Sequence, residues 1–226
     1  MSNYPKTEHE RMLFADGYRL GLSVIENGFN KEKLFDAQRR MYENIDALIE
    51  SLLQHARKQN IAIDCKARCE FCCHQAVFAN SVEIDYLARH IKKQLPNNQQ
   101  RTIAKKAKQK YQLTEQLGSK AVLNLKHKCP LLFDGKCTAY EARPMACRIY
   151  LSMKLSTCQR FFEQPDDKNN YPALLEFPLM AGRMMNEGFL AALKTENIEC
   201  AELKLEHGLN IELNQPEMKI THDSKK

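Results

Sequence analysis

The stretch that decides how this chain folds is residues 65–74, Cys65-Lys-Ala-Arg-Cys69-Glu-Phe-Cys72-Cys73-His74. It places four cysteines within nine residues. Closely spaced cysteines in a turn can converge on one metal ion, because closing so short a loop loses little chain entropy. Charged residues alternate with these cysteines, which argues against a buried strand of the core. The stretch therefore predicts a loop whose thiolates bind zinc or iron, metals soft enough for sulfur.

A second group of cysteines follows, in the stretch that begins Cys-Pro-Leu-Leu-Phe-Asp-Gly-Lys-Cys. It consists of Cys129, Cys137, Cys147 and Cys158. The wider spacings predict a folded loop that brings distant thiols to a site completed by the first group, so we expect both groups in one pocket. Four thiolates around a divalent ion carry net negative charge, which Arg143 and Arg148 would offset.

The cellular compartment decides how nine cysteines in 226 residues are interpreted. The first residues contain no basic segment followed by an apolar one, so we expect no secretory signal. No run reaches the roughly 18 apolar residues of a membrane helix. We therefore expect a cytoplasmic protein without membrane contact, in a reducing environment where structural disulfides are rare. A chain of this length can also build a core without disulfides, which favours metal or redox chemistry for the cysteines.

The charge of the chain gives a weak indication of partners. The formal net charge is +6, but metal-bound thiolates would lower it. Residues 92–110 carry seven lysines and arginines and no acid. A basic run can grip nucleic-acid phosphates, but only Tyr111 lies nearby for stacking, and no nucleic-acid motif accompanies the run. We therefore expect a solvated helix face, no nucleic-acid ligand and no identifiable protein partner.

The periodicity of apolar residues predicts a mainly α fold, with a helical frame around a Cys-rich, loop-rich metal-binding centre. Asn30 is a plausible N-cap, and the sequence from Asn80 to Glu83 resembles a capping box. The expected helices span residues 8–26, 31–58, 81–95, 99–117 and 172–195. Gly17 and Gly21 weaken the helical pattern of the first of these.

The expected organisation has three parts that share one core. They are an N-terminal helical segment at 1–60, a cysteine-cluster metal-binding domain at 61–165, and a C-terminal helix with a polar tail at 166–226.

The two cysteine motifs, CxxxCxxCC and CPLL(x)DGKC(x)xYExRPxxCR, resemble the YkgJ-type cysteine-cluster family of zinc- or iron-chelating domains. The segment Cys-Cys-His-Gln-Ala-Val-Phe-Ala-Asn-Ser-Val-Glu-Ile at 72–84 is also similar to that family, and the resemblance covers about residues 61–165. Three residues separate Cys65 from Cys69, whereas the family often has two. The resemblance implies a bound metal or an iron–sulfur cluster and supplies no defined reaction.

Two enzyme classes remain as alternatives. One branch of the family includes flagellin lysine N-methylases, but these are larger proteins and the rest of the chain does not match them. The spacing of Cys65, Cys69 and Cys72 also resembles the motif of radical S-adenosylmethionine enzymes. That chemistry normally sits in a barrel of alternating strands and helices, whereas the chain downstream predicts helices and no Gly-rich segment for the cosubstrate.

The predicted metal ligands are the eight clustered thiols, namely Cys65, Cys69, Cys72, Cys73, Cys129, Cys137, Cys147 and Cys158. Because ferredoxin-like ligation places proline after a ligand cysteine, Cys129-Pro130 favours an iron–sulfur cluster slightly over zinc. The zinc alternative is a closed structural site, or two sites of four thiols each, in a scaffold or interaction module. An open iron or a redox change would instead indicate an enzyme or electron carrier.

The remaining candidate groups receive smaller roles. We expect His74 and His127 to support the site rather than ligate, and Cys200 to be a free thiol. Because Cys72 and Cys73 are adjacent, we expect one of them to stand beside the metal as a reactive thiolate. Tyr140 is expected to be a packed anchor. No nucleophile–base pair, carboxylate pair or phosphate loop identifies a substrate, so catalytic residues and the reaction stay undetermined.

Overall fold

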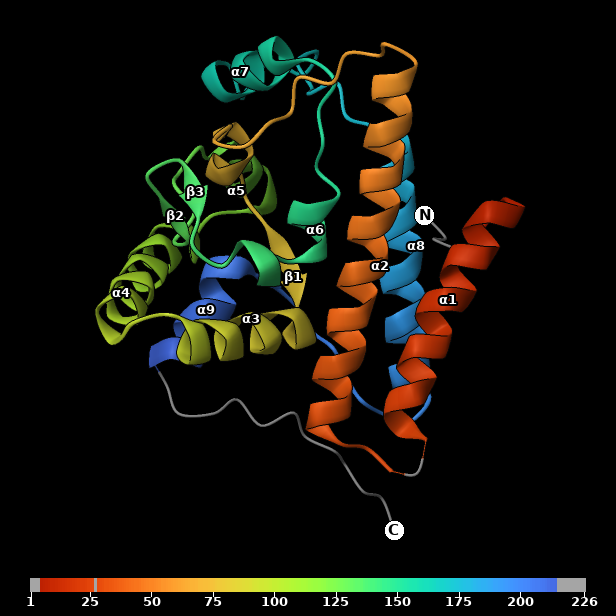
Figure 1. The fold of residues 1–226 in the computed structure, drawn as a ribbon. Helices are drawn as coiled ribbons and strands as arrows, with labels where there is room; N and C mark the ends of the chain where they lie inside the picture. The colour runs from red at the N-terminus through yellow and green to blue at the C-terminus, as the bar shows by residue number, and fades with distance from the viewer. Residues whose placement is uncertain (1–4, 27, 215–226) are drawn as a thin grey trace.

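The structure is a computed structural model that describes residues 5–26 and 28–214, and it is mainly helical, as predicted (Figure 1). The helices are α1 (Glu8–Ile25), α2 (Lys31–Lys58), α3 (Ser81–Gln94), α4 (Asn97–Thr114), α5 (Ser119–Asn124), α6 (Met145–Arg148), α7 (Leu155–Glu163), α8 (Glu176–Lys194) and α9 (Leu205–Asn214), with 3₁₀ turns η1 (Phe71–His74) and η2 (Tyr140–Ala142). The strands are β1 (Phe78–Asn80), β2 (Leu132–Phe133), β3 (Lys136–Cys137) and β4 (Glu202–Lys204).

Three long helices, α1, α2 and α8, lie side by side and form the frame of the molecule (Figure 1). Their apolar faces share one buried core, to which α2 contributes an i, i+3, i+4 stripe. The glycines of α1 allow a close crossing. A Cβ built on Gly17 would lie 1.9 Å from the carbonyl oxygen of Met185, and one on Gly21 2.7 Å from that of Phe189. The glycines that weaken the helical pattern therefore make the packing of α1 on α8 possible.

Capping residues fix where two of the helices begin. Asn30 caps α2 by accepting hydrogen bonds from the backbone N–H groups of Glu32 and Lys33. Asn80 and Glu83 form a complete capping box at the start of α3, in which each side chain accepts from the other residue's backbone N–H. Both predicted caps are confirmed.

A second apolar core lies beside the frame and carries the cysteine loops. Helices α3, α4 and α9 contribute Leu87, Ile103 and Leu209 to it, and Cys129 and Cys137 pack against its edge. The antiparallel pair β1–β4 links this core to the C-terminal part of the chain, with Ala79 opposite Leu203. The cysteine loops therefore rest on a helical layer of their own rather than on the long frame alone.

Within the described residues, no helix is long and apolar enough to cross a membrane. The sequence did not predict α9 or the β1–β4 pair. The division into three parts at 60 and 165 stays a prediction, and the polar tail of the last part lies largely outside the described residues, since the description stops at 214.

Candidate metal centre

The first cysteine group lies in the loop that follows α2 and ends in the turn η1. The backbone N–H of Cys65 donates to the carbonyl of Ser152 at 3.2 Å, which ties the start of the loop to the segment before α7. The N–H of Cys69 donates back to Lys66 at 3.1 Å, and Arg68 takes a positive φ of 70°. The loop is thus a tight turn that is bonded to a segment distant in sequence, and the predicted loop at the first cysteine group is present.

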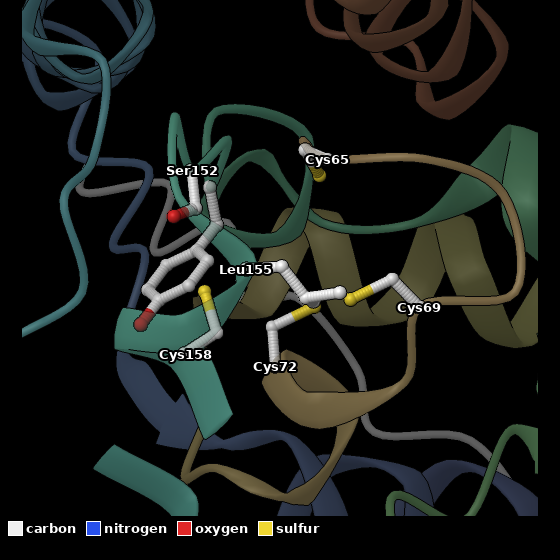
Figure 2. Close-up of a pocket in the computed structure, with 7 residues that line it drawn as sticks. Cys65, Cys69, Cys72, Ser152, Leu155 and Cys158 are labelled. Atoms are coloured by element: carbon white, nitrogen blue, oxygen red, sulfur yellow. The ribbon is translucent and has the colours of Figure 1, made fainter. Parts of the chain in front are cut away.

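A small cavity of about 10 Å³ lies between the thiols of this loop and α7. It is lined by Cys65, Cys69, Cys72, Tyr150, Ser152, Leu155 and Cys158. Figure 2 shows the sulfur atoms of Cys69 and Cys72 turned toward one another, with Leu155 close beside them. Cys158, which belongs to the second group in sequence, therefore joins the first group in space.

The second group is built on the hairpin β2–β3 and the short helix α6. Asp134 and Gly135 both have positive φ, at 46° and 73°, which is the backbone of a tight two-residue hairpin turn. The turn brings Cys137 opposite Leu132, whose N–H donates to the carbonyl of Cys129 at 3.0 Å. Cys147 comes from α6, which follows Pro144.

Main-chain hydrogen bonds join the two groups directly. The N–H of Cys129 donates to the carbonyl of Cys73 at 2.7 Å, and the N–H of His127 donates to that of His74 at 2.9 Å. The predicted meeting of the two groups is therefore present as contact. Cys129, Cys137 and Cys147 do not line the cavity around Cys72, but charge on Cys72 is felt at Cys137 and Cys147, so one common pocket stays a prediction.

Burial shifts the thiols toward their protonated form. It raises the pKa of Cys65, Cys69, Cys137 and Cys158 and raises that of Cys129 to about 11. Backbone N–H groups oppose this by hydrogen bonding to sulfur, from Phe71 to Cys69, from Leu131 to Cys129 and from Ala139 to Cys137. The N–H groups favour thiolates, but a metal must displace protons to obtain them.

The adjacent thiols of Cys72 and Cys73 contact each other. A hydrogen bond with Cys73 and, after it, burial raise the pKa of Cys72 far above the ordinary thiol value. Cys72 is therefore held in its protonated form here, and a reactive thiolate beside a metal stays a prediction.

The two arginines that were expected to offset thiolate charge, Arg143 and Arg148, both pair with Asp46 and anchor the Cys147 loop. Arg148 is almost fully buried and pairs with Asp46 of α2, while its Nε donates to the carbonyl of Arg143 at 2.9 Å and Nη2 donates to that of Glu141. Its guanidinium lies 3.9 Å from the ring centre of Tyr42. Arg143 reaches the same Asp46 carboxylate at 3.3 Å. Positive charge is thus fixed beside the second group of thiols.

Glu83 connects the same loop to α3. Its Oε1 accepts from the hydroxyl of Tyr42 at 2.9 Å and from the backbone N–H of Met145 at 2.7 Å. Its Oε2 accepts from Asn80 in the capping box. Burial raises the pKa of Glu83, whereas these donors act to lower it. One carboxylate therefore ties α2, α3 and the helix that carries Cys147.

Lys110 lies buried beside the second cysteine group, which the sequence did not predict. It belongs to the basic run that we expected to be solvated, but it is only 4% exposed. Its Nζ donates to the carbonyl of His127 at 3.1 Å, and its charge lowers the pKa of Cys129. The apolar neighbours at Ile103 and Ala107 gave a signal, because they place Lys110 on the buried face of α4 at i+7 and i+3.

The other candidates are placed as follows. His74 is buried, with Nδ1 at 3.0 Å from the carbonyl of Glu70 and its ring edge-on to Phe162. Cys200 packs against the first core and lies apart from the clustered thiols. Tyr140 is 62% exposed and stacks with Arg143, so the prediction of a packed anchor was wrong.

No three His, Cys, Asp or Glu side chains of the described ranges stand close enough together to hold a metal ion as they are. The donor set nevertheless fits zinc or iron. It consists of thiols with backbone N–H bonds to sulfur and neighbouring cations, which is the environment that stabilises metal-bound thiolates.

Residues 64–173 match a sequence family named CxxCxxCC and described as "Putative zinc- or iron-chelating domain". No curated protein matches the chain, and no solved structure does. The match begins one residue before Cys65 and includes both cysteine groups through Cys158. Residues 64–173 are therefore similar to the CxxCxxCC family of zinc- or iron-chelating domains.

Proposed function

We propose that this chain is a metal-binding protein that holds an iron–sulfur cluster or zinc through its eight clustered thiolates. The observation that carries the proposal is the convergence of two separate stretches of chain, 152–158 and 127–129, on the loop 65–74. The segment before α7 bonds to Cys65, α7 brings Cys158 to the cavity, and the second loop bonds to Cys73. Cys200, outside the motifs, takes no part in this convergence.

The electrostatics around the thiols support thiolate ligation. Burial raises the pKa of Cys129 and Cys137, and nearby cations act against that rise, Lys110 at Cys129 and Arg143 and Arg148 at Cys137. A site of four thiolates and one divalent ion is doubly negative, and fixed cations reduce the cost of burying that charge. Thiolates in this setting need a reducing environment to stay free of disulfides, and we infer that the protein works in the cytoplasm.

Two features bear on the identity of the metal. The ligand pair Cys129-Pro130 favours an iron–sulfur cluster, as in ferredoxin-like ligation. The four thiols that line the cavity, those of Cys65, Cys69, Cys72 and Cys158, match the ligand number of one zinc ion. Iron–sulfur chemistry would suit electron transfer or redox sensing, whereas zinc would suit a structural scaffold.

The experiment is analysis of the full chain purified without oxygen. Iron, zinc and acid-labile sulfide are measured per chain, together with visible absorption. Iron and sulfide with a brown colour support the cluster, and colourless protein with stoichiometric zinc supports the scaffold. Protein that carries neither metal, and takes up neither iron with sulfide nor zinc, contradicts the proposal.

A further inference from the structure

A basic surface on α4 lies outside the cysteine loops. The helix contains no Asp or Glu, and Arg101, Lys105 and Lys108 are exposed on one face of it. With a rise of 1.5 Å per residue, these positions follow one another by about 6 Å and about 4.5 Å along the helix axis. We call these three residues the basic row. Figure 1 shows α4 at the edge of the molecule, away from the long frame helices.

The charges of the basic row have no acidic partner in the part of the chain that the structure describes. None of the three cations forms an ion pair there. On the frame, by contrast, the exposed Arg39 pairs with Asp36 and Glu43 of its own helix. Like charges at i, i+4 destabilise a helix. An anion bound on this face would therefore relieve repulsion within α4.

The β2–β3 hairpin places an exposed aromatic ring beside this helix. Phe133 is 56% exposed, although the Nζ of Lys106 on α4 lies 5.6 Å from the centre of its ring. The same Nζ donates to the carbonyl of Leu132 at 3.4 Å, which ties the hairpin to α4. Phe133 lies opposite the exposed Lys136 in the antiparallel register, so their side chains share one face of the hairpin. The ring therefore has a cation from each side and still has surface for a ligand.

Phe133 supplies the stacking partner that we did not find near the basic run from sequence. The aromatic residue next to that run in sequence, Tyr111, stacks on His207 of α9 with ring centres 4.6 Å apart. Nucleic-acid bases stack on exposed aromatic rings, while lysines and arginines bind the phosphates. An acidic peptide would match the cations but gives the exposed ring no equivalent partner. The combination therefore favours a nucleic acid whose bases are free to stack.

We propose that α4 and the β2–β3 hairpin bind single-stranded nucleic acid, with the basic row on the phosphates and Phe133 stacked on a base. Contacts of this kind tolerate any base, so binding is independent of sequence and depends strongly on salt. A duplex keeps its bases paired and stacked inside, so it binds more weakly. The acid of the hairpin, Asp134, is exposed in the turn next to Phe133, which directs the phosphates along α4. This inference does not rest on the proposed function.

The test measures binding of the full chain, purified without oxygen, to a fluorescein-labelled oligothymidylate of about 12 nucleotides, a length within the usual range for such surfaces. Fluorescence anisotropy gives the Kd over a series of salt concentrations. Replacing the basic row by three glutamines should weaken binding and flatten the slope of log K against log salt by about 2, because each phosphate contact of a single strand contributes about 0.7. The matched control, Arg40→Gln with Lys58→Gln and Lys194→Gln, removes the same charge from exposed positions of α2 and α8 and should bind like the parent.

Two variants of Phe133 test the ring separately from the charges. Phe133→Leu keeps an apolar side chain but removes the flat ring, so it should weaken binding by roughly 5- to 150-fold, the range for the loss of one stacked base. Phe133→Tyr keeps the ring and should bind like the parent. Circular dichroism and metal content are measured on both variants, so that a change in the fold of the hairpin is distinguished from the loss of stacking.

A polyglutamate peptide of matching charge and a DNA duplex of matching length are the competing probes. Oligothymidylate that binds more tightly than both, and loses affinity in Phe133→Leu, supports the proposal. A parent chain that does not bind oligothymidylate at low salt overturns it, and so does equal binding by the basic-row variant. If polyglutamate binds as tightly and Phe133→Leu changes neither affinity, the face fits acidic proteins and the nucleic-acid inference is wrong. None of these results alters the metal analysis that tests the proposed function.

Discussion

Replacing Arg148 by methionine should loosen the loop that carries Cys147 while keeping the volume of the side chain. The guanidinium pairs with Asp46, donates to the carbonyls of Glu141 and Arg143, and lies over Tyr42. Breaking a buried charged pair costs about 3–5 kcal/mol. The lower end applies here, because the Asp46 side chain is 43% exposed and water can take over part of its bonding.

A loss of about 3 kcal/mol corresponds to a fall in Tm of about 6–12 °C for a chain of this size. The assay is thermal unfolding followed by circular dichroism, with metal content measured on the same samples. Arg19→Met is the matched control, since its pair with Asp16 is 75% and 51% exposed and contributes little. If Arg148→Met has the same Tm as Arg19→Met and keeps its full metal content, Arg148 does not anchor the Cys147 loop.

Three further predictions follow from the contacts. Gly17→Ala should destabilise the chain by about 1–3 kcal/mol, because the added Cβ would lie 1.9 Å from the Met185 carbonyl oxygen. Gly118→Ala, which has open space around it, is the control, and equal Tm values for the two variants would contradict the close crossing of α1 and α8. Lys110→Met should lower the Tm by about 3–12 °C, because it removes the hydrogen bond from the charged Nζ to the carbonyl of His127. Lys108 is exposed on the same helix, so Lys108→Met should leave the Tm unchanged, and equal Tm values for the two variants would contradict the role of Lys110. Zinc binding at neutral pH should release about one proton per thiolate, and a proton count near zero in weakly buffered solution would show that the thiols were already ionised. Because burial raises the pKa of Cys129 to about 11, the metal-free protein should lose stability as pH rises from about 8.5, the pKa of an unfolded thiol, through that value.

The long helices could be predicted from sequence because their signals are local. The apolar stripe of α2 and the caps at Asn30 and Asn80 lie within a few residues of one another, and each was found where the pattern indicated. Helix α9 was not predicted. The pair β1–β4 was not predicted either, because each strand is three residues long and forms only when two segments distant in sequence pair with each other.

The candidate site shows the same division between local and distant information. The cysteine motifs are local and predicted a zinc- or iron-chelating domain, which the family match confirms. The place of Cys158 beside the first loop could not be read from spacing, because it depends on α7 and on the contact of Ser152 with Cys65. The burial of Lys110 likewise depends on which face of α4 the second core covers.

The most direct test of the account measures thiol alkylation in the full metal-loaded chain, with and without a chelator, at every cysteine by mass spectrometry. We expect the eight motif cysteines to be protected until the chelator removes the metal, and labelling of Cys200 to be the same in both samples. Motif cysteines that react equally with and without the chelator would contradict metal binding by these thiolates.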